Sequence, residues 1–271
     1  MPELPEVETT ARGIAPHITG RWIRRLAVHD RRLRWPVAAN LARWAKDQQI
    51  TGVRRRAKYI VVDLERGWLL THLGMSGSML ILPASTARET HDHYDVILDS
   101  GWTLRFNDPR RFGSLHHGTG DVGIHPLLRD LGPEPLDRSF DGDYLHYMTR
   151  GKRVAIKLAI MNSHLVVGVG NIYASEALFR AGIRPERTAD SLEHVECVAL
   201  AAAIKSVLGM AIEHGGTTLR DYVGAGGEPG LFRQELFVYE RAGEACRQCG
   251  AAIKHKVQGQ RSTYFCGSCQ R

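Results

Sequence analysis

Short runs of apolar residues recur through the first half of the chain, and most of them are rich in β-branched or aromatic side chains. Such runs predict strands. Residues 65–67 and 99–101 each end in glycine and lie between consecutive runs, where hairpin turns are expected. Several short strands joined by hairpins predict a β-sandwich over roughly residues 1–130. The runs span residues 22–28, 59–64, 68–73, 93–98 and 102–106.

The apolar period changes from about two residues to about 3.6 after residues 131–135, a short segment with two prolines that favours extended backbone. The pattern predicts an α+β protein, with an N-terminal β-sandwich and flanking helices followed by a helical domain and a C-terminal finger. Helices are expected at residues 5–14, 144–148, 154–161, 172–179 and 192–212. The expected division is a sandwich at residues 1–130, a linker at 131–138, a helical domain at 139–228 and a finger at 236–271.

Composition limits the class of protein. The chain has 271 residues, of which 43% are hydrophobic, so it can bury a large core. No apolar run approaches about 20 residues and the acidic start lacks the layout of a signal peptide, which indicates a soluble cytoplasmic protein without a membrane segment. Lys and Arg outnumber Asp and Glu by 36 to 29, which favours polyanionic partners but is also common on solvated surfaces. No pattern predicts a homo-oligomer, and a monomer is expected.

Four of the five cysteines form the most specific pattern in the chain. Two residues separate Cys246 from Cys249 and Cys266 from Cys269, and sixteen residues lie between the pairs. This spacing is typical of a four-cysteine zinc ribbon, and a pair of disulfides is the weaker alternative in a cytoplasmic chain. Because all four thiolates would be ligands, the expected cofactor is one structural Zn²⁺ ion. Cys197 stands alone in an apolar helical pattern, where a core position is expected.

The segment between the cysteine pairs carries only positive charge. It contains Lys254, His255, Lys256 and Arg261 and has no acidic residue. A zinc-held hairpin of this kind suits the phosphate backbone of a nucleic acid. Zinc ribbons also bind proteins or cap a fold, and the segment alone does not choose between these roles.

The first residues offer a different chemistry. If Met1 is removed, Pro2 carries a secondary amine that can condense with a sugar C1′ to give an iminium ion, and the neighbouring Glu3 can deliver a proton. An α-amino group titrates near pH ~8, so a neutral fraction exists at physiological pH. The alternative is a simple helix start, with Pro5 in the first turn and Glu6 near the positive end of the helix dipole.

Three further segments provide groups that bind phosphates. Gly168 and Gly170 precede Asn171, a residue suited to an N-cap, and leave backbone N–H groups exposed at a helix start, although a plain tight turn is the alternative. Residues 54–58 place three arginines and a lysine before a strand, and residues 107–113 form a loop with two arginines and a phenylalanine. Either of the two basic segments, 54–58 or 107–113, could be an ordinary solvated charge run. Together they supply basic groups in both halves of the chain, as a bound duplex requires.

These motifs make the chain resemble the bacterial formamidopyrimidine-DNA glycosylase (Fpg/MutM) family over essentially its full length. The resemblance implies a helix-two-turn-helix arrangement in the helical domain and a bacterial, nucleoid-associated protein. It also implies a base-excision repair enzyme that removes oxidised purines, such as 8-oxoguanine and formamidopyrimidines, from double-stranded DNA and cleaves the strand on both sides of the abasic site. The motifs are PELPEVE at the start, RRAKY around Lys58, HLGMSGS at 72–78, DPRRFG at 108–113, VVGVGNIYASE at 166–176, GGTTL at 215–219 and the four-cysteine ribbon.

The resemblance assigns catalytic roles to four residues. Pro2 matches the Schiff-base nucleophile, and Glu3 matches the acid that helps to open the sugar. Lys58 matches the lysine linked to β-elimination, and Arg261 matches the arginine linked to δ-elimination. An iminium at C1′ acidifies the C2′ proton, so the two eliminations are chemically reasonable after the attack.

The resemblance also implies DNA contacts. A base that is extruded from the stack leaves a gap, and apolar wedges offset part of the cost of unstacking. Without the resemblance, Met75 and Phe112 would be expected in the core. The loop after Gly216, reaching to Pro229, matches the family's lid over the extruded base. The contacts are His91, Arg110, Lys152 and Asn171, and the residues that fill the gap are Met75, Arg110 and Phe112.

Two other functions are compatible with parts of the pattern. An endonuclease VIII-like glycosylase shares Pro2, Glu3 and the finger but prefers oxidised pyrimidines, and here Leu4 and the DPRRFG motif favour the purine branch. A zinc-ribbon DNA-binding protein without catalysis would need only the finger and the basic groups.

One local departure from the family is that residues 161–164 lie where many members carry an acidic residue, which affects helix capping alone.

Overall fold

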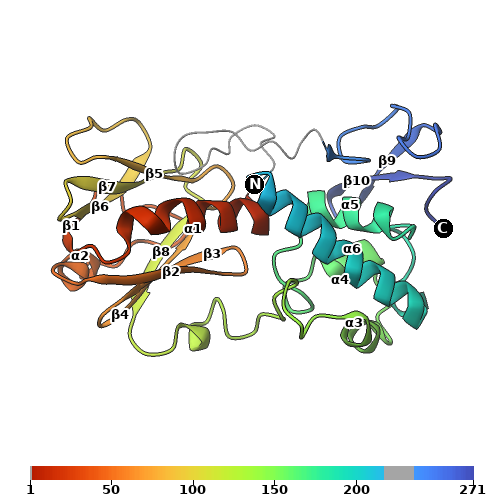
Figure 1. The fold of residues 1–271 in the computed structure, drawn as a ribbon, viewed down its shortest axis with the longest axis horizontal. Helices are drawn as coiled ribbons and strands as arrows, with labels where there is room; N and C mark the ends of the chain where they lie inside the picture. The colour runs from red at the N-terminus through yellow and green to blue at the C-terminus, as the bar shows by residue number, and fades with distance from the viewer. Residues whose placement is uncertain (1, 217–234) are drawn as a thin grey trace. The chain divides into compact units, whose positions relative to one another are not determined.

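The computed structural model describes residues 2–216 and 235–271. The chain divides into two compact units, Met1–Arg129 with His214–Arg233, and Asp130–Glu213 with Gln234–Arg271. The first unit contains two β-sheets, and the second contains the longer run of helices and the cysteine finger (Figure 1). The loop that matches the family's lid lies outside the described residues.

Two antiparallel four-stranded sheets form the first unit (Figure 1). The turns expected at residues 65–67 and 99–101 join strands that pair along their length, for example Val61 with Leu70 and Val96 with Leu104. The predicted β-sandwich is therefore confirmed. In spatial order, one sheet is β1 (Ile23–Val28), β6 (Asp92–Leu98), β7 (Trp102–Asn107) and β5 (Ser78–Pro83), and the other is β2 (Ile50–Arg56), β3 (Tyr59–Leu64), β4 (Gly67–His72) and β8 (Ser114–Gly118).

The apolar pattern does not predict β2, β5 or β8. Three arginines end β2 and two histidines lie in β8, so neither shows the alternation of a half-buried strand. Two of the arginines of β2 pair with acidic neighbours: Arg54 with Asp63 in β3 at 2.8 Å, and Arg55 with Glu8 at 2.7 Å. Arg55, whose side chain is only 8% exposed, is therefore a structural member of the basic run at residues 54–58, whereas Arg54 remains at the surface.

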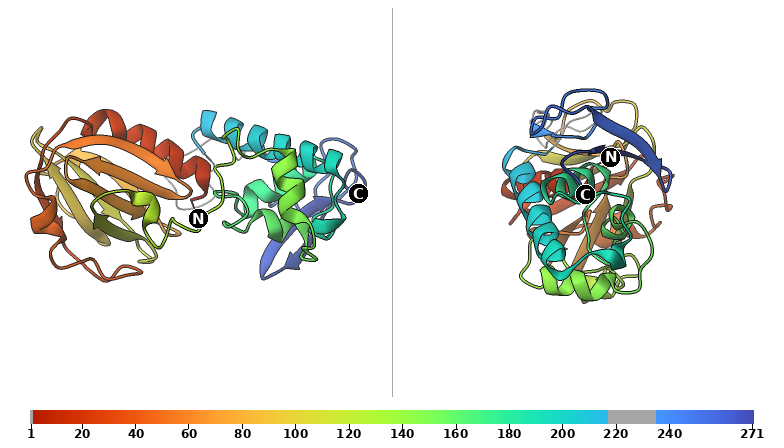
Figure 2. Two further views of the ribbon diagram at one scale, coloured as in Figure 1. Left: turned by 90° about the horizontal axis from the view of Figure 1, so that it is seen from below. Right: turned by 90° about the vertical axis from the view of Figure 1, so that its right-hand side faces the viewer.

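Helix α1 (Leu4–Ile18) runs along the sandwich (Figure 2) and anchors the start of the chain. It continues past Pro16, so it is longer than the predicted helix, and Pro5 lies in its first turn as expected. Its apolar stripe joins a core to which both sheets contribute. Among the buried residues of that core are Val7, Ile14 and Ile18 from α1, Ile60 and Leu69 from one sheet, and Tyr94 and Phe106 from the other.

The second unit is helical and ends in a two-stranded hairpin. The expected N-cap of α5, Asn171, is instead its first residue, because the extended backbone of Gly170 (φ −110°, ψ −161°) occupies the cap position. The Asn171 side chain therefore takes no part in capping. The elements are α3 (Gly142–Thr149), α4 (Ile156–Ile160), α5 (Asn171–Arg180), α6 (His194–Glu213), β9 (Ile253–Gln258) and β10 (Arg261–Cys266), with short pieces α2 (Leu41–Ala45) and η1 (Val122–Ile124) in the first unit and η2 (Ala189–Ser191) in the second.

Helix α6 is long and apolar enough to cross a membrane by length and composition, with a mean hydropathy of 1.9. It packs against α3 and α5, and its inner face is buried at Leu200, Ile204 and Leu208. These contacts are those of a core helix. Cys197 is also fully buried on this helix, so its expected core position is confirmed.

Candidate active site and nucleic-acid interface

Pro2 and Glu3 are both buried at the start of α1. Glu3 is the N-cap residue, and its backbone N–H donates a 2.7 Å hydrogen bond to Glu6 Oε2. This bond closes a capping box and fixes the peptide that joins Pro2 to Glu3. Sequence reasoning gave Glu6 only a helix-dipole role. Its carboxylate in fact orients the two residues that the resemblance makes catalytic.

Lys58 lies in the two-residue turn between β2 and β3. It follows Ala57, a buried residue with a φ of 54°. Arg55 connects this turn to α1, because its Nε donates to Glu8 Oε2 at 2.7 Å and its Nη1 donates to the Ala57 carbonyl at 3.0 Å. One guanidinium thus ties the helix that begins with Pro2 and Glu3 to the turn that presents Lys58.

His72 is a neighbour of Lys58 that sequence reasoning did not single out. Its ring centroid lies 4.9 Å from that of Tyr59, and its Nδ1 accepts the N–H of Gly74 at 2.9 Å. Burial, together with the positive charges of Lys58 and Arg34, lowers the pKa of His72 to about 4. The imidazole is therefore neutral at neutral pH. Its only signal in the sequence is its place at the start of the HLGMSGS motif.

Asp108 joins the loop after β4 to the loop after β7. Its carboxylate is fully buried and accepts hydrogen bonds from Ser76 Oγ at 2.7 Å, from the Gly113 N–H at 2.8 Å and from the Arg110 N–H at 3.2 Å. The backbones are close as well, since a Cβ on Gly74 would lie 2.5 Å from the nitrogen of Gly113. The two loops therefore form one rigid surface element.

Met75, Arg110 and Phe112 are carried by these two loops. The Arg110 guanidinium lies 4.9 Å from the centroid of the Phe112 ring, and Phe112 is 43% exposed. Met75 is half-buried, so neither apolar residue is a core residue. His91 lies beside them, because its carbonyl accepts the Asp108 N–H at 3.1 Å, and its side chain is exposed.

In the second unit, Asn171 contacts Tyr239. Asn171 Nδ2 donates to Tyr239 Oη at 3.4 Å, and its Oδ1 is buried with no hydrogen-bond partner among the described residues. Glu176 on α5 holds the segment that carries Tyr239, since its carboxylate accepts the backbone N–H groups of Phe237, Val238 and Tyr239, each at 2.9 Å. Burial raises the pKa of Glu176, although these hydrogen bonds act in the opposite direction.

Arg261 is exposed at the first position of β10. The strand is docked by Lys157, a fully buried lysine on α4 whose Nζ donates to the Ser262 carbonyl and to Thr263 Oγ1, both at 2.8 Å. At the tip of the hairpin, Gly259 approaches Leu158, and a Cβ there would lie 3.0 Å from the leucine methyl groups. Lys157 is therefore a positioning residue for the backbone next to Arg261. A lysine within an otherwise apolar helical run was its sequence signal.

The four cysteines of the finger are gathered as the spacing predicted. All are free, and their Sγ atoms lie within 4.8 Å of one another. Thiolates at about 2.3 Å from one Zn²⁺ require sulfur separations of about 3.8 Å. The separations are 3.4 Å between Cys249 and Cys266 and 3.9 Å between Cys246 and Cys269. The donor set fits zinc with all four ligands supplied by protein, so the ion that they hold is structural.

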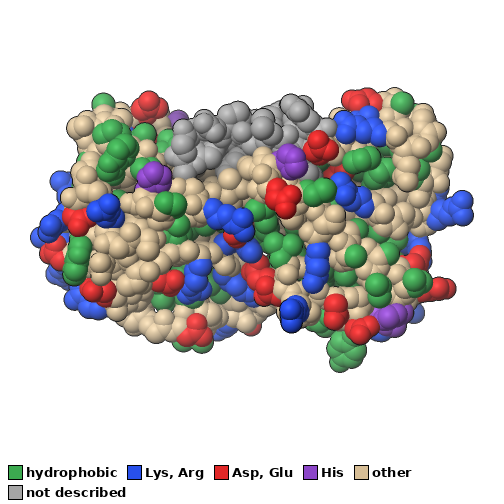
Figure 3. Space-filling view, in the orientation of Figure 1, with side chains coloured by type: hydrophobic (Ala, Val, Ile, Leu, Met, Phe, Trp, Pro, Cys, Tyr) green, Lys and Arg blue, Asp and Glu red, His purple; other side chains and the backbone are tan. Residues whose placement is uncertain are grey.

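Basic side chains are distributed over both units. On the face drawn in Figure 3 they alternate with acidic side chains, so the net charge of +7 forms no continuous patch on that face. Lys256, one of the finger cations, pairs with Glu186. His91, Arg110 and Lys152 are exposed, as a contact with phosphates requires.

Comparisons with known proteins agree with this architecture. The family model for the formamidopyrimidine-DNA glycosylase N-terminal domain matches residues 1–115, the one for the formamidopyrimidine-DNA glycosylase H2TH domain matches 131–223, and the one for the zinc finger found in FPG and IleRS matches 243–271. Formamidopyrimidine-DNA glycosylases from Thioalkalivibrio sulfidiphilus and Xanthomonas axonopodis pv. citri are 55% and 53% identical, and each alignment covers 100% of both chains.

Solved structures of similar proteins extend the agreement to three dimensions. The MutM (Fpg) protein of Thermus thermophilus gives a TM-score of 0.89 at 38% identity, covering 99% of this chain and 98% of that one. Lactococcus lactis Fpg in complex with DNA that contains an abasic site gives a TM-score of 0.92 at 31% identity, covering 100% of both chains. The three family models, the full-length identity and the common fold show that the chain belongs to the formamidopyrimidine-DNA glycosylase family.

Proposed function

We propose that this protein removes oxidised purines, such as 8-oxoguanine and formamidopyrimidines, from double-stranded DNA and then cleaves the strand at the abasic site. Solved Lactococcus lactis Fpg structures contain DNA with Fapy-dG and DNA with an abasic site, which supports both halves of this activity. The observation that carries the proposal is the buried start of α1, where the Glu6 carboxylate holds the peptide between Pro2 and Glu3.

The reaction starts at the amine of Pro2 after Met1 is removed. The nitrogen attacks C1′, the glycosidic bond breaks, and Glu3 supplies a proton to the leaving base or to the ring oxygen. The amine gives up its single proton, the C1′–O4′ bond breaks and the ring oxygen takes up a proton, so the product is an open-chain C1′ iminium; a secondary amine has no second proton to lose, and the positive charge therefore stays. The capping bond from Glu3 to Glu6 keeps the amine and the acid in a fixed relation while the sugar opens.

Two eliminations follow in the proposed sequence. The iminium withdraws electrons from C2′, so removal of a C2′ proton expels the 3′ phosphate, and a second proton loss expels the 5′ phosphate. Lys58 serves the first elimination from a turn that Arg55 ties to α1. Arg261 serves the second from the finger hairpin, where Lys157 holds the backbone of the next residue.

DNA binding is divided between the two units. His91, Arg110, Lys152 and Asn171 contact phosphates, and the gap left by the extruded nucleotide is filled by Met75, Arg110 and Phe112. The pairing of the Arg110 guanidinium with the exposed Phe112 ring supports this role, since both groups are presented to solvent together.

Zn²⁺ supplies no reaction step, because four thiolates leave no coordination position for water or substrate. It closes the finger and so keeps the hairpin that carries Arg261 folded.

We retain the division into a sandwich at residues 1–130, a linker at 131–138, a helical domain at 139–228 and a finger at 236–271. A monomer in the cytoplasm, associated with the nucleoid, suits this activity.

Reductive trapping with borohydride tests the mechanism. Reduction of the iminium links the protein covalently to an oligonucleotide with a single 8-oxoguanine, and the adduct is expected with the processed chain and absent when the terminus is acetylated or retains Met1. Glu3→Gln keeps the amine, so it is expected to lose base removal yet to form the adduct on a preformed abasic site. Absence of any reducible adduct would leave a zinc-ribbon DNA-binding protein without catalysis.

Lesion preference needs a separate comparison. One Lactococcus lactis Fpg structure contains DNA with an oxidised pyrimidine, which favours testing the endonuclease VIII-like alternative directly. Duplexes that carry 8-oxoguanine or thymine glycol at the same position separate the two. Faster excision of 8-oxoguanine is expected, and faster excision of thymine glycol would assign the protein to oxidised pyrimidines.

A further inference from the structure

The loop that ends in His91 is exposed along its whole length. Residues 84–91 connect β5 to β6, and every one of them is exposed. His91 itself has a φ of 75°, a left-handed conformation that residues other than glycine adopt only where the surrounding structure holds them. The position of the His91 side chain is therefore set by the groups that bind the backbone of this loop.

Arg105, a residue of β7 that is only 3% exposed, holds the first part of the loop. Its Nη1 donates to the Ala87 carbonyl at 2.9 Å, and its Nη2 donates to the Thr86 carbonyl at 3.1 Å. The guanidinium is itself fixed, because its Nε and Nη2 donate to the two carboxylate oxygens of Asp95 on β6 at 2.8 Å and 3.1 Å. Such a two-bond pair fixes direction as well as distance.

Asn107, the last residue of β7, holds the second part of the loop. It pairs with Asp92 in the sheet, and its Nδ2 donates to the Thr90 carbonyl at 3.0 Å and to Asp92 Oδ1 at 2.8 Å. The other oxygen of Asp92 accepts the Glu89 N–H at 2.8 Å and lies 3.3 Å from Arg105 Nη1. One amide and one carboxylate thus fix the peptide groups that lead into the left-handed position.

The same strand end joins this loop to the loop of the DPRRFG motif. Asn107 precedes Asp108, whose N–H donates to the His91 carbonyl at 3.1 Å. The Asp108 carbonyl lies 2.8 Å from Nε2 of the buried His93, and because a carbonyl only accepts, Nε2 is the donor. Asn107 therefore lies where the loop of His91 meets the loop that carries Phe112.

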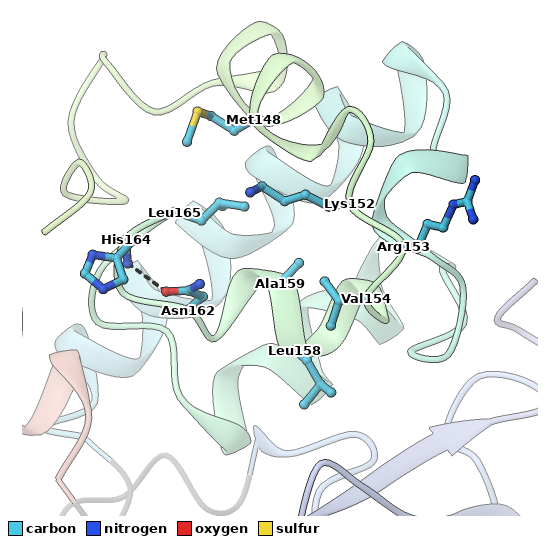
Figure 4. A pocket seen from close by; sticks show the side chains of 9 residues that line it. All are labelled: Met148, Lys152, Arg153, Val154, Leu158, Ala159, Asn162, His164 and Leu165. Carbon is cyan, nitrogen blue, oxygen red and sulfur yellow. Dashed lines mark hydrogen bonds between the residues drawn. The ribbon is translucent and has the colours of Figure 1, made fainter. Parts of the chain in front are cut away.

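Lys152, the proposed phosphate contact of the helical unit, is presented in a different way. Figure 4 shows its side chain extended over a pocket of ≈ 330 Å³. Its backbone follows α3, and its N–H donates to the Thr149 carbonyl of that helix at 3.0 Å. The helix end thus holds the backbone of Lys152, whereas the backbone of His91 depends on the side chains of neighbouring strands.

We propose that Asn107 is a positioning residue for His91, which it places against a DNA phosphate by holding the Thr90 carbonyl and the Asp92 carboxylate. Arg105 supports the first part of the same loop. Both N–H groups of the Asn107 amide are used inside the protein, so it has no donor left for a phosphate of its own. The inference rests on the proposed function through the contact of His91 with DNA.

A double-mutant cycle of Asn107→Ala with His91→Ala tests this role. The zinc-loaded full-length chain is titrated into a labelled duplex with an uncleavable abasic-site analogue, and fluorescence anisotropy measures the affinity. Asn107→Ala is expected to lower the affinity by about threefold to tenfold, and His91→Ala by at least as much. In the His91→Ala background, Asn107→Ala should have no further effect, because the imidazole that it positions is gone.

Two further variants complete the experiment. Arg105→Lys keeps the charge but has three N–H groups in place of five, so its loss of affinity should also disappear in the His91→Ala background. Asn40→Ala is the matched control. Asn40 is an exposed asparagine of the same unit whose side chain forms no capping hydrogen bond with the described part of the chain, and its replacement should leave the affinity unchanged.

Three results would overturn the positioning role. These are an equal loss from Asn107→Ala in both backgrounds, full affinity in Asn107→Ala, and full affinity in His91→Ala. Binding to this duplex requires no attack by Pro2. A chain that shows the coupling but gives no borohydride adduct would therefore keep this inference and lose the proposed reaction.

Discussion

The Ser76 hydroxyl donates a 2.7 Å hydrogen bond to the buried carboxylate of Asp108, and this bond joins the loop that carries Met75 to the loop that carries Phe112. The two loops are separated by three strands in the sequence, β5, β6 and β7. The relative position of the two apolar side chains thus depends on this hydrogen bond as well as on the close approach of the Gly74 and Gly113 backbones.

Ser76→Ala is expected to destabilise the first unit by about 1.5–3 kcal/mol, since a hydrogen bond to a charged group is lost in a buried site. It should also reduce the preference for lesion-containing over undamaged duplex, because Met75 and Phe112 are no longer held together. Chemical unfolding and duplex affinity measure the two effects. Ser85→Ala, at an exposed serine of the same unit, is the control and should change neither. An unchanged lesion preference in Ser76→Ala would argue against a shared role of the loops.

The stability of the first unit is expected to fall as the pH drops from about 6.5 toward 4. The pKa of folded His72 is about 4, whereas an imidazole in an unfolded chain titrates near ~6.5. Between these values the unfolded state binds more protons, so the contribution of neutral His72 is complete above pH ~6.5 and is lost as the pH falls. The full difference corresponds to about 3 kcal/mol.

Urea unfolding at a series of pH values measures this loss. Tryptophan fluorescence reports on the first unit alone, because all five tryptophans lie between residues 22 and 102. His72→Asn can accept the Gly74 N–H but does not titrate, so its stability should depend less steeply on pH. His116, whose pKa is also lowered to about 4 by burial, leaves a residual slope. The same slope in His72→Asn and in the parent chain would show that His72 does not contribute.

Lys157→Met is expected to slow the δ-elimination more than base removal. The Ser262 carbonyl and Thr263 Oγ1 lose a buried donor, which costs about 1–3 kcal/mol and loosens the strand that begins with Arg261. The ratio of β- to β,δ-elimination ends on a labelled oligonucleotide measures the shift. Lys205→Met is the control, since Lys205 Nζ also donates to a backbone carbonyl, that of Asp137, but lies on exposed α6 surface. Equal slowing of base removal and δ-elimination would count against the positioning role.

Removal of zinc with a chelator is expected to unfold the finger and leave the sandwich intact. Thiolate repulsion replaces metal binding when the ion leaves, so the hairpin loses its main constraint. One zinc ion per chain should be released, measured with a metallochromic dye, and DNA affinity should fall. Tryptophan fluorescence should stay unchanged. A large change in that fluorescence would mean that the first unit depends on the metal.

The sequence predicted those elements that have one strong signal, such as a run of β-branched residues or a regular spacing of cysteines. The run at 59–64 coincides with β3, and the cysteine spacing located the finger. β2 was missed because its arginines imitate a solvated charge run, while the ion pair from Arg55 to Glu8 is visible only after α1 packs on the sheet. The N-cap was misplaced by one residue because Gly170 supplies the extended backbone that Asn171 was expected to adopt.

Support residues were the harder part of the site to predict. The N-terminal amine of Pro2 and the thiols of the cysteines are themselves the reactive groups, so sequence alone points to them. Glu176 and Lys157 are charged residues that are almost fully buried, which a sequence pattern treats as improbable. Their partners lie 61 to 106 positions away along the chain, so no local window contains both members of the interaction.

The buried ammonium of Lys157 also limits how this protein can be recombined. A zinc ribbon is often treated as a module that folds by itself. In this one, however, the Ser262 carbonyl accepts a hydrogen bond from Lys157, which lies 105 positions earlier in the chain. Three backbone N–H groups in the segment before the first cysteine pair also donate to the Glu176 carboxylate. A chimera that received residues 236–271 by themselves would leave both anchors behind in the donor. In this protein the finger and the helices before it must be inherited together.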